Sequence, residues 1–308
     1  MTARLFKTFI IVSLLVLSIW LPASGDESPT QHPAILVVVS IADGKVVTLQ
    51  GDRDLFFTPQ PLGSTYKPLL ALAALRDGFD PDTKYFCPPR PITAPSTTRC
   101  WLAAGHGSID LKQALAHSCS VYFRELARKT NPKAFHSVLS DFELLPAGRI
   151  PQPLTPDDMF GYTDKLRITP AALLSAYISI FTGSDRFRFT ADSFDGIASK
   201  PVAASPPVKG RSLLIEGLRL AAEEGTVADA QQTVLGFPVF GKTGTAPVPG
   251  NDREWNGVFI GFAPPDKPKL AVLTILHNSQ GKEAAIAGTQ ALRDAYKRLF
   301  SATPSMLD

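Results

Sequence analysis

The stretch STYKPLLALAAL, residues 64–75, decides how this fold is organised. Ser64 occupies the N-cap position of a predicted helix, and Pro68 falls in its first turn, where proline is tolerated. Leucine and alanine fill nearly all the remaining positions, so the helix is apolar on almost every side. A helix of that kind is buried within a domain. We therefore expect residues 64–75 at the centre of the molecule.

Strands are predicted on both sides of this helix along the chain. The β-branched and apolar residues 34–40 indicate a buried strand, Asp43-Gly44 is a strong hairpin signal, and residues 45–49 form the return strand. Three more β-rich runs lie near the C-terminus: residues 233–240, 255–262 and 270–277. The simplest packing joins all five strands in one antiparallel sheet.

Helices are predicted between the two groups of strands. Asp110 with Gln113 forms a capping-box pattern, and a break at residues 117–120 separates that helix from the next. Further helices are predicted at residues 121–129, 169–181, 211–224 and 283–300. The expected class is α+β: an antiparallel sheet of about five strands flanked by helices, with an all-helical lobe and a cleft between the lobes. Residues 79–107 are expected to be a loop.

The N-terminus has the pattern of a secretory signal. Arg4 and Lys7 precede the apolar run 9–21, and the small residues of Ala23-Ser24-Gly25 follow it. We expect a signal peptide at 1–25, a linker at 26–33 and one domain at 34–303. The domain is thus expected in the periplasm or on the extracytoplasmic face of the membrane. An uncleaved N-terminal anchor is the alternative, although the apolar run is short for a bilayer span.

The charge balance points away from nucleic acid and acidic membrane surfaces. The chain has 31 basic and 28 acidic residues, and no block of like charges stands out. A nearly neutral surface suits a polymer or small-molecule substrate better than a charged one.

Three cysteines are present, at positions 87, 100 and 119. An exported chain permits disulfides, and Cys87 and Cys100 bracket a proline- and threonine-rich loop, so we predict that they pair. Cys119 is then expected to be a buried small hydrophobe. The spacing of cysteines and histidines indicates no metal site, and we expect no metal and no cofactor.

Two short motifs carry lysines suited to activating a nucleophile. In Ser64-Thr65-Tyr66-Lys67, positions i and i+3 face the same way, so the Lys67 amine can reach the Ser64 hydroxyl as general base. The Ser64 N–H, at the helix start, suits a developing oxyanion. The second motif, GKTGT at residues 241–245, follows a β-rich run. Lys242 supplies a second cation, which lowers the pKa of Lys67.

The remaining candidate residues belong to the GKTGT motif and to a third motif in the predicted helix break. Thr243 offers a hydroxyl to a substrate carboxylate, Gly244 lets a ligand backbone approach the strand, and the Thr245 N–H is a second oxyanion donor. The third motif, Ser118-Cys119-Ser120, lies in the predicted helix break. A loop there can direct Ser118 towards Lys67 as a proton relay.

The order S-x-x-K, S-x-S, K-T-G resembles the set S-x-x-K, S-D-N, K-T-G of penicillin-binding proteins and class A β-lactamases, except for the last residue of the second motif. The chain resembles the transpeptidase domain of class B penicillin-binding proteins, and the elongation-specific type most. Four segments carry the resemblance: GSTYKP at 63–68, CWLAAGHGSIDLKQALAHSCSVYFRELA at 100–127, GYTDKLRITPAALLSAY at 161–177, and GKTGTA at 241–246 with WNGVFIGFAPPDKPKLAV at 255–272.

This resemblance implies peptidoglycan cross-linking through an acyl-Ser64 intermediate. The donor would be a stem peptide ending in D-Ala-D-Ala, β-lactams would be covalent ligands, and cell-wall synthesis proteins would be partners. Ser120 stands where the family has Asn or Asp, a residue that holds the substrate amide and the lysine. Class B members also have a large pedestal domain before the transpeptidase, and only a short segment is expected here.

Three alternatives stay open. A D,D-carboxypeptidase would differ only in using water as acyl acceptor. A class D-like β-lactamase or β-lactam sensor has similar S-x-x-K and K-T-G motifs, whereas Glu143 in FELLPAG does not match the class A pattern. A catalytically degenerate scaffold, which Ser120 favours, would hold cell-wall strands or a partner.

Overall fold

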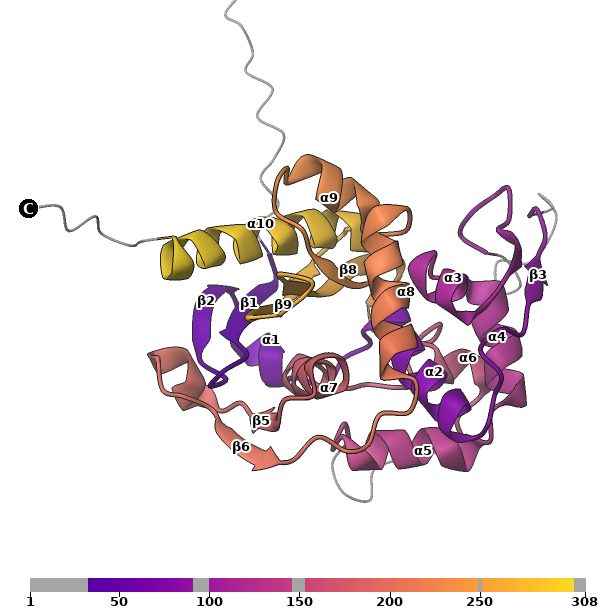
Figure 1. Ribbon diagram of the computed structural model, residues 1–308, viewed down its shortest axis with the longest axis horizontal. Helices are drawn as coiled ribbons and strands as arrows, with labels where there is room; N and C mark the ends of the chain where they lie inside the picture. Colours follow the sequence, from indigo (N-terminus) through magenta and orange to yellow (C-terminus); the bar gives the residue numbers. More distant parts are fainter. Residues whose placement is uncertain (1–32, 91–99, 146–152, 249–250, 302–308) are drawn as a thin grey trace, which may run out of the picture. The chain divides into compact units, whose positions relative to one another are not determined.

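The computed structural model describes residues 33–90, 100–145, 153–248 and 251–301. The expected signal peptide and all but the last residue of the expected linker lie outside these ranges. The predicted α+β class is confirmed, with one five-stranded antiparallel sheet built from both ends of the domain (Figure 1). No described helix is both long enough and apolar enough to cross a membrane.

The sheet has the strand order β2-β1-β9-β8-β7. All four pairings are antiparallel. Its strands are β1 (Ile35–Ser40), β2 (Val46–Gly51), β7 (Phe240–Val248), β8 (Asn251–Ala263) and β9 (Leu270–Leu276). β7 lies at one edge and carries the GKTGT motif.

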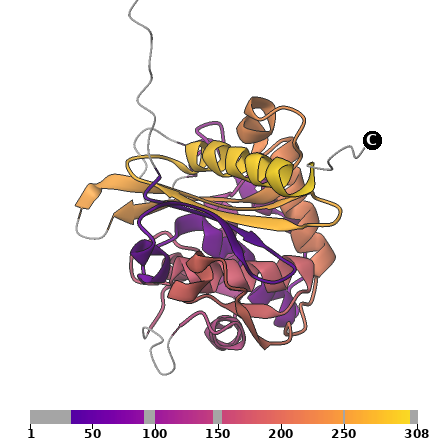
Figure 2. The same cartoon turned by 90° about the vertical axis from the view of Figure 1, so that its left-hand side faces the viewer.

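Alternation along β1 explains why the sheet is covered on both faces. Ile35 and Val37 join the core shared with the central helices, whereas Leu36 and Val38 join a second apolar cluster. That second cluster packs against α10 (Gly281–Phe300), which lies along one face of the sheet (Figure 2). The predicted C-terminal helix is thus confirmed as a cover for the sheet.

The other face of the sheet meets the helical part of the domain. Its main helices are α2 (Lys67–Arg76), α3 (Leu111–Ala116), α4 (Ser120–Lys129), α5 (Pro132–Asp141), α7 (Pro170–Thr182) and α8 (Arg211–Glu223). Short helices α1 (Asp54–Phe57), α6 (Pro156–Met159) and α9 (Ala228–Thr233) complete the set. Every residue from Lys67 to Leu75 is buried, which confirms the central position predicted for this helix.

The start of the central helix differs from the prediction. A 3-10 turn, η1 (Gly63–Tyr66), precedes α2, and Tyr66 is the residue that caps α2. Ser64 therefore lies inside the turn and is not an N-cap. The tight turn is held by Thr65, whose hydroxyl donates to the Leu62 carbonyl at 2.7 Å. Because of this turn, Ser64 precedes the regular helix instead of opening it.

The first C-terminal strand also lies later than predicted. Residues 228–233 form α9, and β7 begins only at Phe240, so of the strand predicted at 233–240 only Phe240 lies in a strand. Gly236 has a left-handed φ of 73°, and Pro238 has no amide to donate to a ladder. These two residues delay the strand, and the GKTGT motif consequently lies within β7 instead of following it.

Short hairpins were not anticipated. β3 (Tyr85–Cys87) pairs with β4 (Gly107–Ile109) inside or beside the region expected to be a loop, and β5 (Arg186–Arg188) pairs with β6 (Lys200–Ala203). Three or four residues are too few to produce a recognisable alternation of apolar and polar side chains.

Candidate active site

A cleft of about 470 Å³ brings the three motifs together. Residues of η1, the turn before α4, and β7 line it: Ser64, Ser118, Ser120, Thr243, Gly244 and Thr245. Residues that the sequence did not single out complete its walls, among them Trp101, Phe160, Thr226, Asp229, Trp255 and Lys282. Six of the predicted site residues thus line one cleft, and the other two, Lys67 and Lys242, contact Ser118 behind its wall.

Ser118 is the meeting point of the two buried lysines. Lys242 Nζ donates to Ser118 Oγ at 2.8 Å, and Lys67 Nζ lies 3.2 Å from the same oxygen. Lys67 Nζ also donates to the Ser118 carbonyl at 2.6 Å and reaches Ser120 Oγ at 3.3 Å. A single hydroxyl therefore connects both amines, as a proton relay requires.

Burial shifts the pKa of both lysines downward. Loss of water around Lys67, which is fully buried, lowers its pKa to about 8, and the rings of Phe123 and Phe160 lie 5.5 and 5.7 Å from its Nζ. Burial also lowers the pKa of Lys242 well below its usual value, and the charge of Lys67 lowers it further. A neutral amine is accordingly accessible near physiological pH.

The turn that presents Ser118 is an unusual backbone feature. Ser118 has a φ of 51°, in the left-handed region that non-glycine residues rarely adopt. Cys119 then caps α4, its Sγ accepting from the Tyr122 amide at 3.4 Å. The break predicted at residues 117–120 is confirmed, and it holds Ser118 at the cleft although that residue is only 6% exposed.

Ser64 reaches the cleft with its hydroxyl available for reaction. Its side chain is partly exposed and lines the cleft, and the hydrogen bonds of the described residues include none from this hydroxyl. Lys67 contacts Ser118 and Ser120 instead. The Tyr177 hydroxyl donates to the Thr65 carbonyl at 2.5 Å and fixes the turn that carries Ser64.

The strand β7 forms the wall facing η1. Thr243 Oγ1 donates to Thr226 Oγ1 at 2.7 Å, and the Gly281 amide donates to Thr245 Oγ1 at 3.2 Å. Gly244 is required because a Cβ there would lie 2.6 Å from the Leu62 carbonyl oxygen. The sequence analysis expected a ligand backbone to lie close to Gly244. In this structure the backbone at Leu62 lies there instead.

A second glycine allows equally close packing beneath the nucleophile. Gly161 has a φ of 78°, and a Cβ there would overlap the carbonyl oxygen of Gly63. Backbone thus packs directly on backbone on two sides of η1.

The cysteines differ from the prediction. Cys87 and Cys100 are free thiols in this structure, as is Cys119, and all three are buried. Instead of pairing, Cys87 and Cys100 both approach His106 Nδ1, and Cys100 Sγ lies 3.9 Å from Cys119 Sγ. Both sulfurs thus contact the same imidazole nitrogen, and the predicted bond between them is not formed in this structure.

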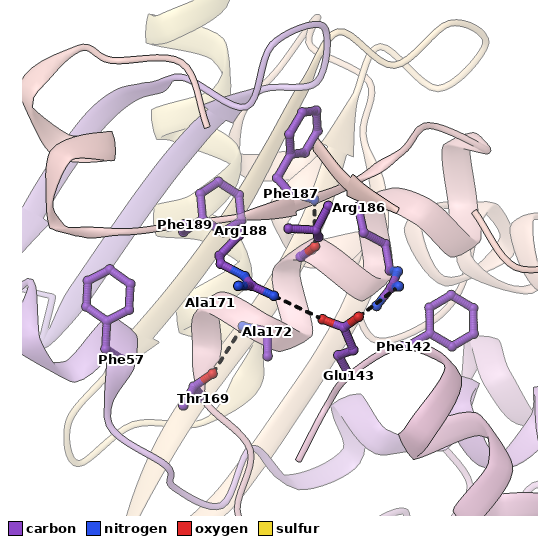
Figure 3. Close-up of a pocket in the computed structure, with 12 residues that line it drawn as sticks. Phe57, Phe142, Glu143, Thr169, Ala171, Ala172, Arg186, Phe187, Arg188 and Phe189 are labelled. Carbon is purple, nitrogen blue, oxygen red and sulfur yellow. Dashed lines mark hydrogen bonds and ion pairs between the residues drawn. The ribbon is translucent and has the colours of Figure 1, made fainter. Parts of the chain in front are cut away.

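A separate cavity of about 200 Å³ contains Glu143 (Figure 3). Its carboxylate accepts from Arg186 at 3.2 Å and forms an ion pair with Arg188 at 3.7 Å. Four phenylalanines also line this cavity, and Glu143 is absent from the walls of the Ser64 cleft. This carboxylate is therefore engaged with two arginines and is not placed to activate water at Ser64.

The sequence of this chain is similar to those of known peptidoglycan-related proteins. The chain is 26% identical to the peptidoglycan D,D-transpeptidase MrdA of Acinetobacter baumannii over 281 residues, covering 74% of this chain and 41% of that one. It is 27% identical to the stage V sporulation protein D of Bacillus subtilis, covering 59% and 32%. The chain thus spans less than half of the length of these two curated relatives.

Solved structures show the same fold. PBP2 of Pseudomonas aeruginosa in complex with WCK 5153 superposes with a TM-score of 0.68 at 19% identity, covering 90% of this chain and 76% of that one. PBPA of Mycobacterium tuberculosis gives a TM-score of 0.69 at 19% identity, covering 86% and 74%. The family description "Penicillin binding protein transpeptidase domain" matches residues 34–297. This chain belongs to the penicillin-binding protein transpeptidase domain family.

Proposed function

We propose that this domain is a peptidoglycan D,D-transpeptidase that works through an acyl-enzyme on Ser64. One observation carries the proposal: two buried lysines share the Ser118 hydroxyl in the same cleft that Ser64 lines. Relatives named as D,D-transpeptidases support the choice of reaction. The substrate would be a stem peptide ending in D-Ala-D-Ala.

The first half-reaction begins at Ser64. Its Oγ attacks the carbonyl carbon of the penultimate D-Ala and loses its proton to the neutral amine of Lys67. Backbone N–H groups of Ser64 and Thr245 would stabilise the oxyanion that forms. The C–N bond then breaks, the leaving D-Ala amine takes a proton from Ser118, and the lysine pair reprotonates Ser118. An acyl-Ser64 ester and free D-Ala result.

The second half-reaction reverses the proton path. An acceptor amine attacks the ester carbonyl and gives up its proton through Ser118 to the lysine pair. The Ser64 oxygen leaves and is reprotonated, and the product is a new peptide bond between two stem peptides. If water replaced the amine, the same residues would carry out a carboxypeptidase reaction.

Ser120 preserves part of the role that Asn or Asp plays in the family. Its hydroxyl lies 3.3 Å from Lys67 Nζ, so the contact to the lysine is kept. A hydroxyl has no carbonyl and amide pair with which to hold a substrate peptide group. We therefore propose that Ser120 helps to orient Lys67 and binds substrate more weakly than an asparagine would.

We further propose β-lactams as covalent ligands and cell-wall synthesis proteins as partners. A P. aeruginosa relative has been solved with WCK 5153, and PBP2 of Helicobacter pylori in complex with MreC. An exported location, in the periplasm or at the outer face of the membrane, would give the cleft access to peptidoglycan.

The rate of acylation is expected to depend on pH through Lys67. Its pKa of about 8 means that the reactive neutral amine becomes scarcer as the pH falls. The second-order rate constant for benzylpenicillin should rise about tenfold per pH unit below this value and level off above it. Stopped-flow or quenched labelling at a series of pH values measures it. A flat profile between about pH 6 and pH 8 would contradict a titrating Lys67.

Intact-protein mass spectrometry with benzylpenicillin over time tests the proposed function. We expect a long-lived adduct on the peptide that contains Ser64, and unfolded protein as control should give none. A short-lived adduct with consumption of the drug would replace the proposal with a β-lactamase. No adduct would favour a degenerate scaffold, and Ser120→Asn would then be the first variant to test for recovered labelling.

A further inference from the structure

A buried arginine outside the Ser64 cleft has most of its hydrogen-bond donors unused. Arg186 of β5 is only 6% exposed, yet among the described residues its guanidinium makes one hydrogen bond, from Nη2 to Glu143 Oε1 at 3.2 Å. Its Nε is buried without a partner in the same part of the chain. A guanidinium carries five N–H donors, and arginine is almost never fully buried unless it is paired. Buried donors of this kind require a further acceptor, which a bound ligand can supply.

A bulge in the hairpin of β5 and β6 explains why Arg186 is turned inward. The register of the two strands shifts between Arg186 and Phe187, and both of these consecutive side chains are buried. In a regular strand, neighbouring side chains point to opposite faces, so only one of the two would be buried. The Phe187 amide donates to Ser175 Oγ at 3.0 Å, which ties the hairpin to α7. The backbone therefore fixes the position of the buried guanidinium.

The cavity that Arg186 lines combines this charge with apolar walls. Figure 3 shows Arg186 and Arg188 on either side of the Glu143 carboxylate, with aromatic rings around them. Phenylalanines from four parts of the chain line the cavity, at positions 57, 142, 187 and 189. No residue that lines it also lines the Ser64 cleft. Its volume of about 200 Å³ suits a small molecule.

The charged groups of the cavity leave one positive charge unbalanced. Arg186 and Arg188 are the two cations among its lining residues, and Glu143 is the single anion. Glu143 Oε2 lies 3.7 Å from Arg188 Nη2, which is longer than a hydrogen bond, and the Arg188 side chain is 67% exposed. One further monoanion would balance the charges and accept hydrogen bonds from the donors that Glu143 leaves unused.

We propose that this cavity binds a small carboxylate with an aromatic or branched apolar body, at a site separate from the Ser64 cleft. The planar guanidinium of Arg186 matches the planar geometry of a carboxylate, and Arg188 would supply a second cation. The phenylalanine rings would contact the apolar body of the ligand and shield it from water. Glu143 would stay between the two arginines.

Neither a structural ion pair nor buried water accounts for this arrangement as well. A buried ion pair is favourable only when further hydrogen bonds satisfy the remaining donors, and Arg186 makes a single one. A buried water needs two to four polar partners, whereas most of the residues around this cavity are apolar. A carboxylate with an apolar body satisfies both the guanidinium and the rings.

Fluorine NMR of the full chain with 4-fluorobenzoate as the probe tests the proposal. We expect saturable broadening of the fluorine signal, with about one probe per chain and affinity of about 1 mM. Ala172→Leu, which fills the cavity without changing its charge, should abolish the broadening, and Arg188→Gln should weaken binding about tenfold. Arg128→Gln is the matched control, because Arg128 is an exposed arginine of α4 outside the cavity. It should bind the probe like the unmodified chain.

The sign of a further effect separates a ligand site from a structural ion pair. Glu143→Gln removes the competing carboxylate, so binding of 4-fluorobenzoate should become about tenfold tighter, and uncharged 4-fluorobenzamide should bind at least about tenfold more weakly than the carboxylate. Equal binding of the two probes would overturn the proposal, as would broadening that does not saturate or that persists in Ala172→Leu.

Acylation with benzylpenicillin shows whether the probe occupies the Ser64 cleft. The broadening by 4-fluorobenzoate should be the same before and after the reaction, because the two sites share no lining residue. Loss of the broadening after acylation would place the probe in the cleft and overturn the proposal. The comparison of variants requires no acylation, so the carboxylate site and the acyl-enzyme can fail independently.

Discussion

Ser64→Ala should eliminate covalent labelling by a fluorescent penicillin, whereas the unmodified domain should label to completion. The acyl group needs an oxygen nucleophile, and alanine at this position has none. The Ser64 hydroxyl makes no hydrogen bond among the described residues, so its removal should leave the fold unchanged. Gel fluorescence measures the labelling and a thermal melt measures the fold.

The matched control for this substitution is Ser108→Ala, which removes an exposed serine hydroxyl from β4. That variant should label like the unmodified domain. Labelling that persists in Ser64→Ala would show that another residue is acylated, and peptide mapping would identify it. Loss of labelling together with a large fall in Tm would mean that unfolding, rather than the missing oxygen, caused the result.

Lys67→Met should lower the rate constant of acylation by about 10² to 10⁴-fold, the usual contribution of a general base. Methionine is similar in length and apolar, and it should be tolerated beside Phe123 and Phe160, which surround the Lys67 amine. The residual reaction should lose the rise with pH that we expect of the unmodified domain. Pre-steady-state labelling across pH gives both results at once.

Lys133→Met is the control, since Lys133 is an exposed lysine of α5. Its acylation rate and pH profile should match those of the unmodified domain. A rate for Lys67→Met within a few-fold of normal, with the pH dependence intact, would transfer the role of base to Lys242. Lys242 is the natural candidate, because its amine also contacts Ser118 at 2.8 Å.

The sequence was sufficient to predict the architecture where the apolar pattern was long. The central helix and the C-terminal helix were predicted closely, because each carries an apolar pattern over at least ten residues. The ends of helices and strands were harder to predict where they depend on one or two residues. Gly236 and Pro238 postpone β7 in a run that is otherwise β-rich, and the 3-10 turn at Ser64 has no distinctive composition.

The candidate site was predictable in membership but less so in geometry. Motif order indicated that Ser64, Lys67, Ser118 and Lys242 belong to one site. Ser64 and Ser118 line the cleft, and the two buried lysines contact Ser118. The spacing of Ser64 and Lys67 indicated a mutual contact, yet tertiary packing directs the lysine to Ser118. Local periodicity cannot show which of two nearby hydroxyls a long, flexible side chain will choose.

The cysteine and histidine cluster was missed for a different reason. Its members come from β3, from the segment before β4 and from the cap of α4, which lie far apart in the sequence. Only folding of the hairpin onto the helix start brings the four side chains together. Two of the cysteines bracket a single loop, which favoured a disulfide in the sequence interpretation.

The backbone contacts at Gly161 and Gly244 restrict where this site can change. Any side chain at either position would collide with the carbonyl oxygen of Gly63 or Leu62, next to the nucleophile. If β-lactams acylate Ser64 as proposed, substitutions that alter their binding are expected at the rim, where Trp101, Asp229 and Trp255 are exposed. An inhibitor that contacts only the backbone between Gly161 and Gly244 would therefore be difficult to exclude by substitution.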